Sequence, residues 1–68
     1  MGKISLKAAR VNKRLLQKEA AKMLKISNKT LSNWESGKTF PKSDKIDEIC
    51  HLYGVTYNDL YFSPNKPL

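Results

Sequence analysis

The sequence predicts a compact all-α domain of five helices, and three observations lead to this prediction. Apolar residues recur at helical spacing through most of the chain, and no segment shows the strict alternation of a half-buried strand. Residues that can cap helices precede these segments, and Gly37 and Gly54 follow two of them. A chain of 68 residues has room for one domain. We expect this domain at residues 1–62, followed by a flexible tail at residues 63–68.

The first two helices are expected at residues 6–13 and 17–24. Ser5 precedes the first helix, and its side-chain oxygen can accept a hydrogen bond from a backbone N–H of the first turn. In the second helix, apolar residues lie together on one face: Ala20, Ala21 and Leu24.

The next two helices are expected at residues 27–36 and 43–53, with Ser27 and Ser43 as their N-caps. Core packing is the expectation for Trp34, which falls on the inner stripe of the earlier helix. In the later helix, apolar residues repeat at i, i+3, i+4 and i+7, which is typical of an amphipathic helix facing a core: Ile46, Ile49, Cys50 and Tyr53.

A short fifth helix is expected from Thr56 through Phe62. Thr56 and Asp59 have the spacing of a capping box, in which each side chain accepts a hydrogen bond from the other residue's backbone N–H. The aromatic residues of this segment allow two interpretations, a cover for the small core or part of a dimer surface: Tyr57, Tyr61 and Phe62.

The net charge of +7 is distributed unevenly along the chain. Residues 1–42 carry 11 Lys and Arg against two acids, whereas residues 43–68 carry two Lys against four acids. A strongly basic part of a small domain favours binding to polyanions, of which nucleic acid is the commonest. The alternative is a lysine-rich surface that only keeps the chain in solution.

The composition argues against several other classes of protein. No nucleophile–base pair, acid pair or phosphate-binding loop is present, so an enzyme is not expected. One cysteine and one histidine are too few for a zinc site, so we expect no metal and no cofactor. No apolar run approaches the length of a membrane span. We therefore expect a cytoplasmic protein that does not bind membranes, and the single thiol fits that compartment.

The second and third helices, with the short connection between them, predict a helix-turn-helix over about residues 17–35. Ala21 is small where the two helices must cross closely. The outer side of the third helix carries residues that can form hydrogen bonds, none of them acidic: Asn28, Lys29, Ser32 and Asn33. Asparagine can pair with N6 and N7 of adenine, and lysine can donate to O6 and N7 of guanine. This side of the helix is therefore suited to the major groove of DNA.

Residues 6–62 resemble the Cro/phage-repressor family of helix-turn-helix domains, also called the XRE family. The resemblance is carried by Leu6-x3-Arg10, Gln17-x3-Ala21, Ile26-Ser27-x2-Thr30-Leu31-x2-Trp34-Glu35-x-Gly37, Pro41, Ile46-x2-Ile49 and Gly54-Val55-x3-Asp59-Leu60. The segment 27–37 is the most specific part. The resemblance implies a fold like that of the lambda repressor domain, with double-stranded DNA as the partner.

The resemblance also implies roles for individual positions. Bases would be contacted from the third helix by Asn28, Lys29, Ser32 and Asn33. The DNA backbone would be contacted by Gln17, Ser27, Lys38, Thr39 and Lys42, and Gln17 would also support a side chain that reads bases. Arg14 and Lys18 join the expected phosphate contacts because they lie nearest the start of the second helix. Phosphate contacts set register and affinity, and the recognition helix sets sequence choice.

Two further expectations concern structure. Members of the family often pair the residues at the positions of Arg10 and Glu35, which both lie on otherwise inward faces here. We therefore expect a partly buried ion pair. The family usually has glycine in the turn between the second and third helices, where this chain has Lys25. A left-handed backbone at a residue other than glycine costs about 1–2 kcal/mol.

These observations favour a bacterial or phage transcription regulator, and a repressor in particular. We expect a homodimer on an operator with two half-sites about one helical turn apart. The alternative is a DNA-binding antitoxin or accessory protein that acts mainly through a protein partner.

Overall fold

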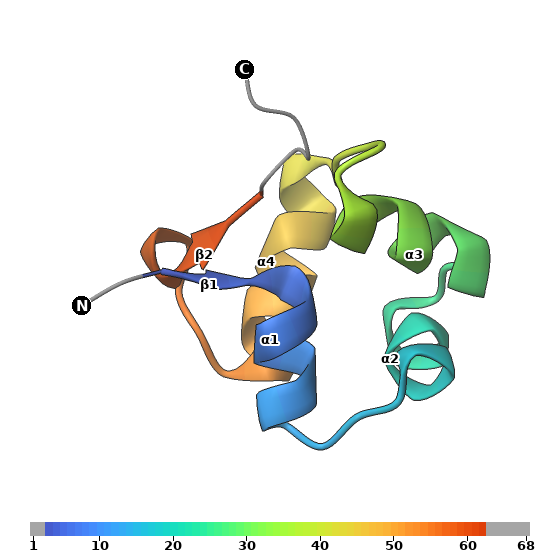
Figure 1. Ribbon diagram of the computed structural model, residues 1–68, viewed down its shortest axis with the longest axis horizontal. Helices are drawn as coiled ribbons and strands as arrows, with labels where there is room; N and C mark the ends of the chain where they lie inside the picture. Colours follow the sequence, from blue (N-terminus) through green and yellow to red (C-terminus); the bar gives the residue numbers. More distant parts are fainter. Residues whose placement is uncertain (1–2, 63–68) are drawn as a thin grey trace.

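The computed structural model describes residues 3–62, and this part of the chain contains four α-helices (Figure 1). They are α1 (Leu6–Asn12), α2 (Gln17–Leu24), α3 (Asn28–Ser36) and α4 (Ser43–Tyr53). A single 3-10 turn, η1 (Tyr57–Asp59), follows them. Two short strands, β1 (Ile4–Ser5) and β2 (Leu60–Tyr61), pair in parallel, with Ile4 opposite Leu60 and Ser5 opposite Tyr61. The predicted tail at residues 63–68 lies outside the described residues.

The prediction of five helices is wrong, because the last segment forms η1 and β2 in place of a fifth α-helix. The capping interaction is present, since the Thr56 N–H donates to Asp59 Oδ2 at 2.9 Å, and this bond lowers the pKa of the Asp59 carboxyl. It closes only one 3-10 turn. Leu60 is then extended (φ −105°, ψ 150°), which pairs it with β1 and buries its side chain. The expectation of an all-α domain without strands is also wrong, because residues 3–62 contain β1 and β2.

The helix starts follow the predicted caps in two cases out of three. Ser5 Oγ accepts from the Ala8 N–H at 3.1 Å, and Ser27 Oγ accepts from the Thr30 N–H at 3.0 Å. Ser43 is not a cap: Lys42 is the N-cap of α4, and Ser43 is its first helical residue. The reason is that the Lys42 carbonyl already accepts the Ile46 N–H at 2.9 Å.

The core is a single cluster to which all four helices and β2 contribute. Its fully buried large side chains are Leu24, Leu31 and Ile49. Trp34 and Tyr53 are buried as predicted, whereas Ile46 and Cys50 are only half-buried. Within residues 3–62, no helix is both long and apolar enough to cross a membrane.

The hydroxyl of Tyr53 is a polar group inside this core. It is buried and has no hydrogen-bond partner among residues 3–62. Burial, with a further contribution from the nearby Glu35 charge, raises the pKa of Tyr53 to about 12. The folded state therefore holds a proton that the unfolded chain releases near pH 10.

We expect the free energy of unfolding to fall as the pH rises between about 10 and about 12, and Tyr53→Phe to remove part of that fall. At neutral pH this variant is expected to be as stable as the wild type or slightly more stable, because it removes a buried hydroxyl without a partner. Urea unfolding at several pH values measures both effects. A loss of more than about 1 kcal/mol at neutral pH would show that the hydroxyl does form a hydrogen bond.

The turn between α2 and α3 has the left-handed residue that the family pattern implied. Lys25 has φ 60° and ψ 44°, and its N–H donates to the Lys22 carbonyl at 3.1 Å. Ile26 closes the turn through an N–H donated to the Ala21 carbonyl at 3.0 Å. The helix-turn-helix geometry is therefore kept at a cost in backbone strain.

We expect Lys25→Gly to raise the free energy of unfolding by about 1 kcal/mol, because the relief of left-handed strain exceeds the added entropy of glycine in the unfolded chain. Chemical denaturation measures the change. Arg14→Gly is the matched comparison, since Arg14 is also exposed and also has φ 60°. A lower stability of Lys25→Gly would mean that the lysine side chain stabilises the turn by more free energy than its left-handed backbone costs.

Candidate nucleic-acid interface

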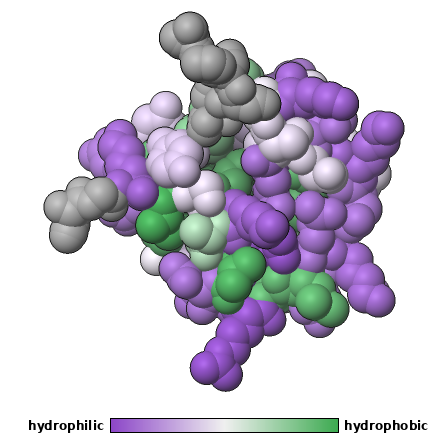
Figure 2. All heavy atoms as spheres, in the orientation of Figure 1, coloured by the Kyte–Doolittle hydropathy of each residue, from purple (hydrophilic) through white to green (hydrophobic). Residues whose placement is uncertain are grey.

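Helix α3 is packed so that its polar side faces solvent. Leu31 and Trp34 are buried on its inner side and fix its rotation about its own axis. The other side carries the residues predicted to contact bases, three of them exposed and one half-buried: Asn28, Lys29, Ser32 and Asn33. Figure 2 shows hydrophilic side chains gathered over α2 and α3 on the right of the molecule. This surface can exchange hydrogen bonds with a ligand without disturbing the core.

The start of α3 is stabilised by Ser27. Its hydroxyl accepts from the Thr30 N–H and donates to Thr30 Oγ1 at 2.9 Å. The sequence predicted Ser27 both as the N-cap of this helix and as a contact to the DNA backbone, and its side chain does cap the helix. The cap satisfies one of the N–H groups that a helix start leaves unpaired and thereby fixes the first turn of α3.

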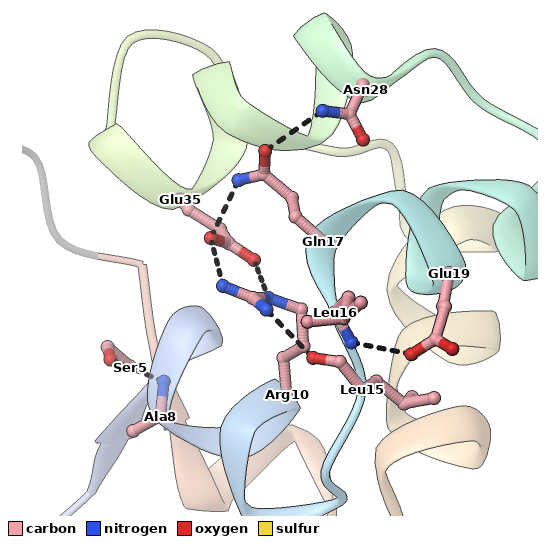
Figure 3. A network of polar contacts seen from close by, with 9 residues as sticks. All are labelled: Ser5, Ala8, Arg10, Leu15, Leu16, Gln17, Glu19, Asn28 and Glu35. Atoms are coloured by element: carbon pink, nitrogen blue, oxygen red, sulfur yellow. Dashed lines mark hydrogen bonds and ion pairs between the residues drawn. The ribbon is translucent and has the colours of Figure 1, made fainter.

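An ion pair joins α1 to α3 behind this surface (Figure 3). Arg10 Nε donates to Glu35 Oε2 at 2.8 Å, and Arg10 Nη2 donates to Glu35 Oε1 at 3.3 Å. Arg10 Nη1 also donates to the Leu15 carbonyl at 2.8 Å. The two side chains are only 9% and 7% exposed, so the pair is screened from solvent. The guanidinium thus holds α1, α3 and the segment leading into α2 in one arrangement.

Gln17 connects the ion pair to the outer surface. Its Nε2 donates to Glu35 Oε1 at 3.1 Å, and its Oε1 accepts from Asn28 Nδ2 at 3.2 Å. Figure 3 shows the four side chains as one continuous line from α1, through the first residue of α2, to the first residue of α3. The structure therefore brings together Gln17 and Asn28, for which sequence reasoning predicted related roles. It also adds the Gln17–Glu35 hydrogen bond, which no local pattern indicated.

The other residues predicted to contact phosphates are all exposed: Arg14, Lys18, Lys38, Thr39 and Lys42. The structure does not gather them in one place. Figure 1 shows the connection between α1 and α2 at one end of the molecule and the loop between α3 and α4 at the other, with α2 and α3 between them. Cations spread along such a surface are suited to an extended polyanion more than to one small anion.

Two observations concern possible metal-ligand and thiol groups among residues 3–62. No group of three His, Cys, Asp or Glu in that range could hold a metal ion. Burial raises the pKa of the Cys50 thiol, with Asp47 and Asp59 contributing, and this disfavours the thiolate form needed for catalysis or metal binding.

Comparison with known proteins agrees with the helix-turn-helix fold. Residues 4–65 match a family described as a helix-turn-helix domain, which is nearly the whole chain. The chain belongs to the helix-turn-helix domain family. The resemblance seen in the sequence is thereby confirmed.

A curated relative of this helix-turn-helix domain is the HTH-type transcriptional activator BcrR of Enterococcus faecalis. The two are 34% identical over 55 residues, which is 81% of this chain and 27% of the relative. The helix-turn-helix domain thus spans about a quarter of the length of the relative it matches.

Proposed function

We propose that this helix-turn-helix domain is a transcription regulator without enzymatic activity that binds double-stranded DNA at specific sequences. The observation that carries the proposal is the solvent-facing side of α3, which presents amides, a hydroxyl and a lysine beside the start of α2. Family membership and the basic residues 1–42 support it. A helix of this kind fits the major groove, where base pairs present distinct patterns of donors and acceptors.

In this proposal α3 reads the bases and its surroundings hold the DNA backbone. The base contacts come from Asn28, Lys29, Ser32 and Asn33. The phosphate contacts come from Arg14, Gln17, Lys18, Ser27, Lys38, Thr39 and Lys42, with Ser27 acting through its backbone because its hydroxyl caps α3. Release of counterions from the contacted phosphates makes such binding weaken steeply as salt rises.

We further propose that two copies bind together on a site with two similar half-sites. A surface of one short helix offers few base contacts, and a second copy doubles them. The exposed rings of Tyr57 and Tyr61, 60% and 46% exposed, offer apolar area to a second copy. Phe62 packs against the core instead, with its ring 6.0 Å from that of Tyr57.

Repression is the sign of regulation that we propose, because a bound dimer excludes other proteins from its site without needing another surface. The name of the relative describes an activator, and activation requires a further contact with the transcription machinery. A reporter gene whose promoter overlaps the selected site tests the sign. Lower expression in the presence of the protein supports repression, and higher expression contradicts it.

Selection from a pool of random duplexes at two salt concentrations tests the function itself. We expect an inverted repeat to be enriched, with affinity falling steeply at the higher salt. A pool without any preferred sequence, bound by protein that circular dichroism shows to be folded, would contradict sequence-specific binding.

A second candidate function, action mainly through a protein partner, is favoured by one feature. A groove between α2 and α4 has an apolar floor and an acidic rim, and it is lined by Met23, Leu24, Asp47, Glu48, His51 and Leu52. Met23 is 58% exposed there. An antitoxin or accessory protein would use such a surface. This candidate gains if the duplex selection returns no preferred sequence.

A further inference from the structure

We propose that the groove between α2 and α4 is a docking site for a basic amphipathic helix of another protein, whose large apolar residues are flanked by lysine or arginine. The inference rests on the second candidate function given above, action through a protein partner, and it names the chemistry of that partner. The groove has a volume of about 390 Å³, at the small end of ligand-sized cavities. It therefore suits the anchoring side chains of a segment.

The floor of the groove is apolar and formed in advance. Leu24 is buried at the end of α2, and Leu52 is half-buried on α4, so both are held by the core. Lys45 joins the two helices, because its Nζ donates to the Leu24 carbonyl at 2.7 Å. On the α2 side lies Met23, whose unbranched and polarizable side chain adapts to the shape of a contacting group. An apolar side chain can therefore enter without disturbing either helix.

The rim of the groove on α4 is acidic, and the needs of the helix explain only part of this charge. Asp44 lies in the first turn of α4, where the helix dipole favours an acid. Asp47 and Glu48 lie beyond that turn, where the effect of the dipole has faded. Glu48 is paired with Lys45 at 3.1 Å, whereas Asp47 is exposed and forms no ion pair within residues 3–62. The carboxylate of Asp47 is therefore available to a cation of the partner.

The acidic rim selects against two other occupants. DNA is itself an anion, so it is repelled from this side of α4. Two copies of the groove that met around a two-fold axis would bring the acids of one copy onto those of the other, which is unfavourable. A head-to-tail contact with the basic part of a second copy is the remaining alternative within this chain, and the experiments below test it.

A helix is the form of segment that fits a groove between two helices, where apolar residues about one turn apart enter together. From Asp47 to Leu52 the lining of α4 extends over about 8 Å. Two apolar residues four positions apart on a helix are separated by about 6 Å along its axis, so both fit within that length. Lysine or arginine residues beside them then lie near Asp47.

The groove lies on a different flank of α2 from the surface proposed to bind DNA. Its lining residues belong to α2 and α4. Met23 follows Gln17 by six residues, which places the two about 120° apart around the axis of α2. The partner and DNA therefore bind to separate surfaces, and a docked partner is carried to the site that α3 reads.

Two synthetic helical peptides of about 15 residues test the docking. Both have leucines four positions apart on one face and alanine elsewhere, and the leucines are flanked by lysines in one peptide and by glutamates in the other. Titration of isotope-labelled protein, followed through backbone amide resonances, measures the affinity and locates the site. We expect the lysine peptide to bind at least about tenfold more tightly. The largest shifts are expected at the residues that line the groove: Met23, Leu24, Asp47, Glu48, His51 and Leu52.

Three outcomes of this titration would overturn the proposal. One is no binding of the lysine peptide, and another is equal binding of the two peptides, which would indicate an apolar contact without the role that we give to the acids. The third is a set of shifts concentrated away from the groove.

Variants of the groove test the two kinds of contact separately, with circular dichroism to show that each is folded. Asp47→Lys is expected to reverse the preference, so that the glutamate peptide binds more tightly. Asp44→Lys is the matched control, because it makes the same change of charge on α4 at an exposed acid that does not line the groove. We expect it to keep the preference for the lysine peptide. A preference that survives Asp47→Lys would overturn the proposal.

The apolar contact is tested by Met23→Ser, which is expected to weaken binding of the lysine peptide by about fivefold or more. Val11→Ser is the matched control, because Val11 is 53% exposed and lies on α1, outside the groove. We expect its affinity for the peptide to equal that of the wild type. Equal weakening by the two variants would contradict a specific contact with Met23.

Sedimentation equilibrium of the wild type and of Met23→Ser, without DNA or peptide, tests a second copy as the occupant. We expect the variant to have the same state of association as the wild type. A wild-type oligomer that dissociates in Met23→Ser would assign the groove to a second copy and overturn the proposal.

Duplex binding separates this proposal from the DNA-binding function. We expect Met23→Ser to bind the selected duplex as tightly as the wild type does, and a marked loss would contradict the separation of the two surfaces. If duplex selection fails while the peptides bind as expected, the DNA-binding function is wrong and the docking site stands. If selection succeeds and the lysine peptide does not bind, the docking site is wrong and the DNA-binding function stands.

Discussion

Replacing Arg10 with Met is expected to lower the free energy of unfolding by about 3–5 kcal/mol, because the Glu35 carboxylate is then buried without its partner. The expected loss is large for this chain, since a domain of this size has little stability in reserve. The guanidinium also binds the Leu15 carbonyl, so the segment before α2 loses an anchor as well. A thermal melt followed by circular dichroism measures the change in midpoint.

Lys7→Met is the matched control, because Lys7 lies on the same helix and is exposed. We expect its midpoint to stay close to that of the wild type. An unchanged midpoint in Arg10→Met would show that the ion pair contributes nothing to stability.

Replacing Asn28 with Ala is expected to abolish the preference at one base pair of each half-site, with a loss of discrimination of about 1–3 kcal/mol. Asn28 is exposed at the start of α3 and is held in place by Gln17, so it is well placed to contact a base edge. Because the helix is capped by Ser27, α3 should remain folded in the variant. Competition binding with duplexes altered at single positions measures the discrimination.

Lys38→Ala is the comparison for Asn28→Ala, since Lys38 is an exposed cation in the loop after α3. We expect it to weaken binding to all duplexes similarly. The slope of log affinity against log salt concentration should decrease by about one, as expected for the loss of one phosphate contact. If Asn28→Ala behaved in the same way, Asn28 would be a backbone contact and the assignment of base reading to it would be wrong.

The parts of the fold that sequence reasoning predicted well are those fixed by neighbours in the chain. The limits of α2 and α3 follow from apolar spacing and from Ser27 and Gly37, which act within a few residues. The left-handed turn at Lys25 was implied by the family pattern and not by the residue itself. Local signals and the pattern together were enough to place the helix-turn-helix.

The error over the fifth helix arises where a distant segment decides the conformation. The Thr56–Asp59 capping box is compatible with an α-helix or with one 3-10 turn. Pairing with β1, at the other end of the chain, selects the extended conformation at Leu60. The sequence of neither strand indicates this pairing, because each strand has only two residues and is too short to show an alternating pattern.

The sequence predicted which residues form the candidate site better than it predicted the hydrogen bonds between them. The outward position of Asn28 and Lys29 follows from the helical period, once Leu31 and Trp34 are placed inside. The hydrogen bond from Gln17 to Glu35 depends on how α2 crosses α3, which no spacing in the sequence specifies. Three-dimensional packing therefore supplies the link between the core and the reading surface.

The central claim is that the polar side of α3 is the surface that binds DNA. Titration of isotope-labelled protein with the selected duplex, followed through backbone amide resonances, tests it most directly. We expect the largest shift changes at the start of α2, along α3 and in the loop at residues 37–42. Changes concentrated instead at the groove between α2 and α4, around Met23 and His51, would contradict the claim.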